Sequence, residues 1–122
     1  MKHIIKPFFL LLPILLPGFF TGCFKNTGSS PDNYKTAMFW SLRSADSGSV
    51  SARKMLGAMY YLGDGVPKDL KIAYMWYKLA ADQGDPSAKT FLSMITQLLS
   101  ENELSEAQML FSEKQKTIHS SD

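Results

Sequence analysis

The stretch DLKIAYMWYKLAADQGDPSAK (residues 69–89) closely repeats an earlier one, NYKTAMFWSLRSADSGSVSAR (residues 33–53), 36 positions upstream. Aligned without a gap, eight of the 21 residue pairs are identical, among them Trp40 and Trp76. A fixed period of about 20 to 50 residues is the mark of stacked supersecondary units. The sequence therefore predicts an internal repeat in which each unit completes the core of its neighbour.

The second copy has the pattern of a helix followed by a tight turn. Its small and aromatic residues recur at i, i+3, i+4, i+7 and i+8, which is one face of an α-helix; they are Ala73, Trp76, Tyr77, Ala80 and Ala81. Asp69 stands at the expected N-cap and Gly84 at the expected C-terminal end. Asp85 followed by Pro86 predicts the start of another helix.

A further helix is predicted before the second copy, within residues 51–69. Its apolar residues share a helical spacing: Ala52, Met55, Leu56, Met59 and Tyr60. Gly57 lies inside this helix, where it costs about 1 kcal/mol relative to Ala. Such a glycine indicates a close helix crossing that a side chain would block. Gly63 and Gly65 suit left-handed backbone positions in the loop that follows.

The repeat pattern weakens towards the C-terminus. Ser100 and Glu103 form a predicted capping box at the start of a last helix, and terminal repeats are expected to be atypical because one face meets water. We predict an all-α fold, a short α-solenoid of antiparallel helix pairs with about five helices over residues 33–117. Residues 118–122 are expected to be a disordered tail.

Most large apolar residues are expected to serve the core. Trp40 and Trp76 are predicted core anchors, with an aromatic ligand site as the less favoured interpretation. Most of the methionines are expected to fill gaps in the core; they are Met38, Met55, Met59, Met75, Met94 and Met109.

Residues 56–88, LGAMYYLGDGVPKDLKIAYMWYKLAADQGDPSA, closely resemble the Sel-one-like (Sel1-like) repeat, a branch of the tetratricopeptide-type α-solenoids. The residues that match its recurring marks are Ala52, Leu56-Gly57, Met59-Tyr60, Gly63-Asp64-Gly65-Val66, Asp69, Ala73, Trp76-Tyr77, Ala80-Ala81 and Gln83-Gly84. Residues 33–48 look like the second helix of a preceding unit whose first helix is missing. The resemblance implies pairs of antiparallel helices and a role in protein binding.

The N-terminus has the layout of a secretory signal peptide, predicted over residues 1–22. A basic start with Lys2, His3 and Lys6 precedes an apolar run over residues 8–20 and a small-residue end. This run is shorter than the roughly 20 residues of a membrane span. Pro13 and Pro17 further disfavour a spanning helix.

Residues 20–23, FTGC, resemble the lipobox of bacterial lipoproteins, although Phe20 replaces the usual Leu. The resemblance implies cleavage before Cys23 and covalent lipid on its sulfur. The alternative is a conventional signal peptide that leaves Cys23, the chain's single cysteine, as a free thiol. Two or three acyl chains give durable anchoring, and residues 24–32 read as a tether that reaches at most about 30 Å.

The implied location is the bacterial cell envelope. Phe24 follows Cys23, whereas an Asp there would favour inner-membrane retention in enteric-type bacteria. The expected position is therefore the outer membrane, facing the periplasm, with the lipid on Cys23 holding the chain at the membrane.

Several function classes are disfavoured. From Cys23 onward the chain carries 11 basic and 11 acidic residues, so it lacks the basic stripe of a nucleic-acid-binding protein. Its two histidines, His3 and His119, lie in the signal peptide and the tail, which leaves no basis for a His-based triad or metal cluster within the fold. We expect no enzyme activity, no metal and no cofactor other than the lipid.

A protein or peptide of the envelope is the expected partner. Solenoids offer a surface lined by the first helix of each pair. The residues expected to project from it are Arg53, Lys54, Met55, Tyr61 and Lys89. The preferred function is a non-catalytic adaptor or scaffold; the alternative is a periplasmic immunity or inhibitor lipoprotein that neutralises a toxic hydrolase effector.

Overall fold

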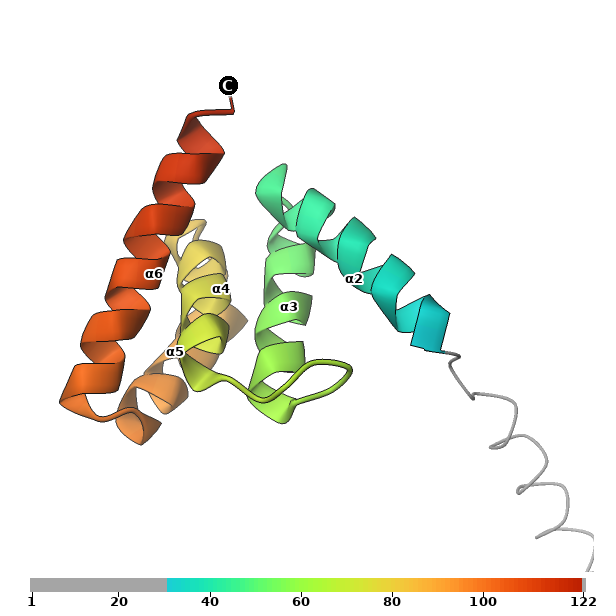
Figure 1. Ribbon diagram of the computed structural model, residues 1–122. Coiled ribbons are helices and arrows are strands. Elements are labelled where there is room, and N and C mark those ends of the chain that lie inside the picture. The colour runs from blue at the N-terminus through green and yellow to red at the C-terminus, as the bar shows by residue number, and fades with distance from the viewer. Residues whose placement is uncertain (1–30, 122) are drawn as a thin grey trace, which may run out of the picture. The chain divides into compact units, whose positions relative to one another are not determined.

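The structure is a computed structural model that describes residues 31–121. These residues form five α-helices joined by turns and a loop (Figure 1). In chain order they are α2 (Pro31–Asp46), α3 (Val50–Leu62), α4 (Leu70–Asp82), α5 (Pro86–Leu98) and α6 (Glu101–His119). No strand occurs among these residues. The all-α solenoid architecture predicted from the repeat is confirmed.

Polar caps begin the helices at the predicted residues. Asp69 accepts hydrogen bonds from the backbone N–H groups of Lys71 and Ile72 at the start of α4. Asp85 accepts from the N–H of Ala88 at the start of α5. These side chains satisfy backbone donors that have no partner within the first turn of a helix.

The capping box of α6 also forms as predicted. The Ser100 hydroxyl accepts from the N–H of Glu103, whose carboxylate accepts in turn from the N–H of Ser100. These two Ser100 contacts hold the pKa of Glu103 below its ordinary value. The sharp change of direction after α5 is therefore fixed by local contacts.

Glycines in the left-handed region end α3 and α4. Gly63 caps α3 with φ of 70°, and its N–H donates to the carbonyl of Met59. Gly84 follows the C-cap of α4, Gln83, with φ of 95°. Other residues rarely adopt this conformation, so both helices stop where the sequence predicts.

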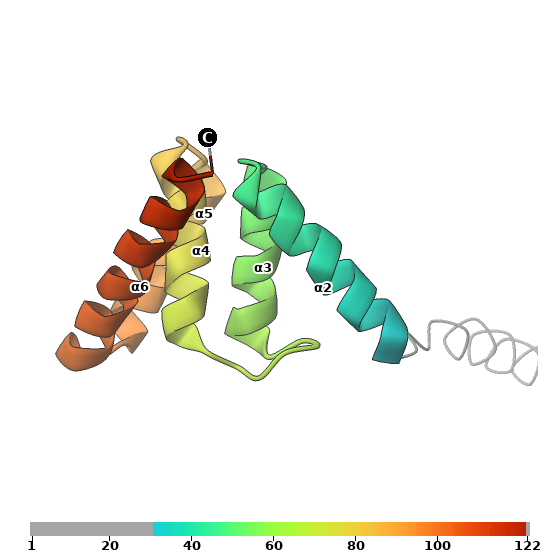
Figure 2. The ribbon, with the colours of Figure 1, turned by 45° about the horizontal axis from the view of Figure 1, so that its top comes forward.

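Helix α4 is the centre of the packing, because it contacts α3, α5 and α6. Figure 2 shows α3 between α2 and α4, with α5 and α6 on the other side of α4. One side of α4 contributes Ala73, Tyr74, Tyr77, Ala80 and Ala81 to a core shared with Ala88, Ile95 and Ala107. The other side contributes Met75, Trp76 and Leu79 to a core shared with Ala45, Ala52 and Leu56.

Trp76 is a core anchor, whereas Trp40 is not. Trp76 is 2% exposed, and the ammonium of Lys114 on α6 lies 5.2 Å from its ring centroid. Trp40 stands at the same repeat position but is 58% exposed, so its predicted core role is wrong. The two tryptophans differ because their helices have different numbers of neighbours. Helix α4 contacts α3, α5 and α6. Helix α2 lies beside α3 near the turn that joins them and then diverges from α3 (Figures 1 and 2).

The methionines divide between core and surface. Met75 is buried, and Met38 and Met59 pack partly buried against the same core. The other three described methionines are exposed, which corrects the expectation that most of them fill gaps; they are Met55, Met94 and Met109. These positions lie on outward faces of α3, α5 and α6.

The buried side of α2 touches the loop between α3 and α4. The hydroxyl of Tyr34 donates to Asp64, 3.1 Å away, and the Tyr34 ring lies against Gly65. This contact holds the loop that precedes α4.

Helix α6 extends beyond the predicted solenoid boundary at residue 117. It continues to His119, and Ile118 packs partly buried against the core that holds Trp76. Burial of the Ile118 side chain stabilises the last turn of α6.

Candidate protein-interaction surface

The first helices α3 and α5 expose apolar residues at equivalent repeat positions. Met55 on α3 and Phe91 on α5 are 36 residues apart, as are Leu62 and Leu98, and all four are exposed. Met94 lies one turn after Phe91 and is also exposed. We call these five residues the first-helix face.

Aromatic side chains link the first-helix face to the core. The ring of Phe91 stacks on Tyr77 of α4, with centroids 5.1 Å apart and planes 15° apart. Tyr77 is buried, and its burial raises the pKa of its phenol, with the nearby phenol of Tyr61 acting in the same direction. Tyr61 is half-buried against the same core. The ring of Phe91 is thus held in place by Tyr77, and only part of its surface is open to solvent.

A polar link joins α3 to the start of α5. The ammonium of Lys54 lies 3.1 Å from a carboxylate oxygen of Asp85 and 3.1 Å from the hydroxyl of Ser87. Hydrogen bonds from Ser87 and the backbone N–H of Ala88, together with Lys54, lower the pKa of Asp85 to about 2. The link holds the two helices of the face together by charge and hydrogen bonding.

Arg53 does not project from the surface, contrary to expectation. Its side chain is 6% exposed, and its Nε–H donates to the carbonyl oxygen of Ala45 at the end of α2, 2.9 Å away. Burial lowers the pKa of Arg53, while the charge of Asp46 acts in the opposite direction. The side chain turns inward because the C-terminal end of a helix attracts positive charge and offers carbonyl acceptors.

The other predicted residues lie on α3 and α5, in differing surroundings. Met55 is 50% exposed, and Lys89 is exposed near the start of α5. Lys54 and Tyr61 are half-buried, engaged by Asp85 and by the core respectively. Of the five predicted residues, Met55 and Lys89 are open to solvent. Their part in binding stays a prediction.

Four members of the first-helix face were absent from the predicted set: Leu62, Phe91, Met94 and Leu98. The 36-residue period could have found Phe91, because it carries Met55 onto that position, and it pairs Leu62 with Leu98 in the same way. What the period does not show is which side of each helix remains uncovered.

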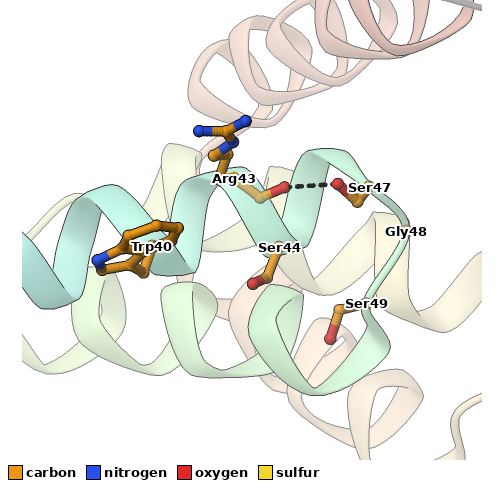
Figure 3. A pocket seen from close by; sticks show the side chains of 6 residues that line it. All are labelled: Trp40, Arg43, Ser44, Ser47, Gly48 and Ser49. Carbon is orange, nitrogen blue, oxygen red and sulfur yellow. Dashed lines mark hydrogen bonds between the residues drawn. The ribbon is translucent and has the colours of Figure 1, made fainter.

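A shallow hollow lies at the turn between α2 and α3 (Figure 3). It has a volume of about 560 Å³ and is lined by Trp40, Arg43, Ser44, Ser47, Gly48 and Ser49. The hydroxyl of Ser47 donates to the carbonyl of Arg43, as Figure 3 shows, and the hydroxyl of Ser49 accepts from the N–H of Ala52. Both hydroxyls thus serve the turn itself.

The described residues hold no cluster of three His, Cys, Asp or Glu side chains that could bind a metal ion. Within the same range, every buried side-chain nitrogen or oxygen has a hydrogen-bond partner. None of the helices from α2 to α6 is long and apolar enough to cross a membrane. The signal peptide predicted over residues 1–22 and the lipid site predicted at Cys23 lie outside the described residues.

Comparison with known families agrees with the repeat seen in the helices. The family model described as Sel1 repeat matches two adjacent segments, residues 19–49 and 50–85, which together exceed half of the chain. The second match spans α3, α4 and the turn after them, and the first contains α2. No curated protein and no solved structure matched the chain. Sel1 repeats are generally protein–protein interaction modules, and the protein described here belongs to the Sel1 repeat family.

Proposed function

We propose that this protein is a non-catalytic envelope lipoprotein that binds another protein through the first-helix face and holds it close to the membrane. The observation that carries the proposal is the exposure of apolar side chains at equivalent positions of α3 and α5, Met55 with Phe91 and Leu62 with Leu98. Exposed apolar side chains that lie together on a protein surface mark sites of protein–protein contact, and the 36-residue period places these two pairs at equivalent positions of neighbouring units.

The first-helix face is ordered before binding and suits a short segment of the partner. Its two helices are tied by the contact of Lys54 with Asp85, and Phe91 is braced by Tyr77. A surface that is ordered before binding loses little conformational entropy when the complex forms. With two first helices available, a single helix or extended peptide of the partner fits better than a large flat surface.

Affinity capture from envelope extracts tests the binding surface. Met55→Glu and Leu98→Glu each place a charge on the first-helix face, and Met109→Glu does the same at an exposed methionine on α6. Exposed substitutions change stability by about 0.5 kcal/mol or less, so all three variants should fold. We expect the captured partner to be lost with the first two variants and retained with the third. Equal capture by all three would contradict the proposal.

The lipid anchor is proposed on the lipobox-like sequence ending at Cys23. Cells fed a labelled fatty acid should transfer it to the wild-type chain, whereas Cys23→Ser should remain unlabelled and accumulate as an uncleaved precursor. Met109→Glu is the control for expression and should be labelled normally. An unlabelled wild-type chain would remove the membrane from the proposed function and leave the binding surface to be judged separately.

A further inference from the structure

Helix α2 carries an aromatic pair that the fold leaves open to solvent. Phe39 is 55% exposed, and its ring meets that of Trp40 edge to face, with centroids 5.5 Å apart and planes at 76°. The residues at the same repeat positions of α4, Met75 and Trp76, are both buried. The second repeat unit therefore buries the residues at these two positions, whereas the first unit leaves its aromatic pair exposed.

The charges beside the aromatic pair favour an anionic surface. Arg43 lies one turn after the pair and Lys35 one turn before Phe39; both are exposed, and neither forms an ion pair within residues 31–121. Asp46 is neutralised by Lys114, 2.7 Å away. Asp32 lies in the first turn of α2, where it complements the helix dipole.

We propose that the aromatic pair lies in the interfacial layer of the membrane that holds the lipid anchor. This inference rests on the proposed lipidation of Cys23. Seven residues, 24–30, separate Cys23 from the start of α2, and they reach at most about 25 Å. Trp40 lies nine residues into α2, about 14 Å along the helix axis. The tether is therefore long enough for α2 to lie along the lipid surface and too short to carry it far away.

The chemistry of the pair suits that layer. Tryptophan is enriched where hydrocarbon meets headgroups, because its ring is largely apolar and its N–H donates a hydrogen bond. The guanidinium of Arg43 can bind a headgroup phosphate in a bidentate manner. Burial of two aromatic rings then adds to the affinity that the acyl chains provide.

Cleavage before Cys23 would leave too short a segment to cover the pair with a helix of the repeat. It would leave eight residues ahead of α2, whereas the first helix of the next unit, α3, has 13. The segment left after cleavage is thus shorter than a first helix of the repeat, and the lipid surface is the occupant within reach.

Fluorescence of the full lipidated protein tests this inference. Wild type and Trp40→Phe are reconstituted into vesicles of phosphatidylethanolamine and phosphatidylglycerol, with or without brominated acyl chains, which quench tryptophan on contact. The wild-type signal minus that of Trp40→Phe reports Trp40, and the variant alone reports Trp76. We expect a blue shift and strong bromine quenching for Trp40, with neither change for Trp76.

Other results would overturn the inference in distinguishable ways. A Trp40 signal that brominated lipid leaves unchanged and aqueous acrylamide quenches would show that α2 stays in water. A signal that neither agent quenches would show that protein covers the pair, whether a second copy or the chain's own N-terminal segment. In both cases an acylated Cys23, confirmed by mass, leaves the proposed function intact. Lack of acylation would instead remove the premise that the two proposals share.

Discussion

The ring of Tyr77 lies so close to Gly57 that a Cβ on this glycine would be 2.7 Å from two of the ring carbons. Real Cβ atoms are essentially never this close to another heavy atom, so either the ring or the helix would have to move. Tyr77 is buried, and its ring also stacks with that of Phe91. The crossing of α3 and α4 is therefore set by the absence of a side chain at residue 57.

Gly57→Ala is expected to destabilise the fold by about 1 to 3 kcal/mol, which is typical of overpacking, despite a gain in helix propensity of about 1 kcal/mol. Urea denaturation measures the change. Ser93→Ala is the matched control, because Ser93 has the same repeat position on α5 and is exposed; it should be nearly neutral. A Gly57→Ala variant as stable as wild type would contradict the close crossing.

The two tryptophans should respond differently to the same truncation. Trp76→Ala leaves a cavity between α3, α4 and α6 and is expected to cost about 3 to 5 kcal/mol. Trp40→Ala removes an exposed side chain and is expected to change stability by about 0.5 kcal/mol or less. Urea denaturation of the lipid-free protein compares them directly. Equal losses would mean that α2 is packed on its outer side.

Removal of the buried guanidinium should loosen the junction of α2 and α3. Arg53→Met keeps much of the apolar stem but loses the hydrogen bond to the Ala45 carbonyl, and a bond from a charged donor contributes about 1.5 to 3 kcal/mol. Amide hydrogen exchange in α2 should become faster, while exchange in α5 should not change. Exchange unchanged in both helices would show that this contact does not hold α2.

The Asp85 carboxylate, held by Ser87, the N–H of Ala88 and Lys54, gives a predicted pH dependence. The pKa of Asp85 falls from an ordinary 3.8 to about 2 in the folded chain. A lowered folded-state pKa stabilises the fold above the unfolded value, and this contribution is lost as pH falls through about 2. Asp85→Asn keeps a good N-cap but loses the charge. The variant should therefore be less stable than wild type at pH 7, with a difference that shrinks below pH 3.8 and vanishes only below about pH 2.

Ser87→Ala provides the control for that titration. It removes the hydrogen bond that lowers the pKa of Asp85 most, so the pH range in which stability is lost should move upward. A stability difference between wild type and Asp85→Asn that stays constant from pH 7 to pH 2 would show that the charge contributes nothing.

Local signals in the sequence predict the helices and their ends well. Asp69, Asp85 and Ser100 cap helices because each acts on N–H groups within three residues of itself. The close crossing at Gly57 was also predictable, because a glycine weakens a helix interior and is favoured there where a side chain would not fit. These features depend on spacing alone.

Exposure depends on neighbours that the repeat pattern does not contain. Trp40 and Trp76 share a repeat position, but only α4 is enclosed by other helices. Arg53 could be placed on a helix, whereas its acceptor, the Ala45 carbonyl, is brought there by the α2–α3 turn. Of the first-helix face, only Met55 was predicted. The repeat period identifies equivalent positions on α3 and α5, but it does not show which side of each helix is exposed to solvent.

Site-specific photocrosslinking in living cells shows directly whether the first-helix face binds a protein. A photoreactive residue is placed at Met55, at Leu98 or, as the control, at Met109, all exposed in the structure. We expect positions 55 and 98 to yield an adduct of the same mass and position 109 to yield none. No adduct at positions 55 and 98, or the same adduct at all three, would contradict this expectation.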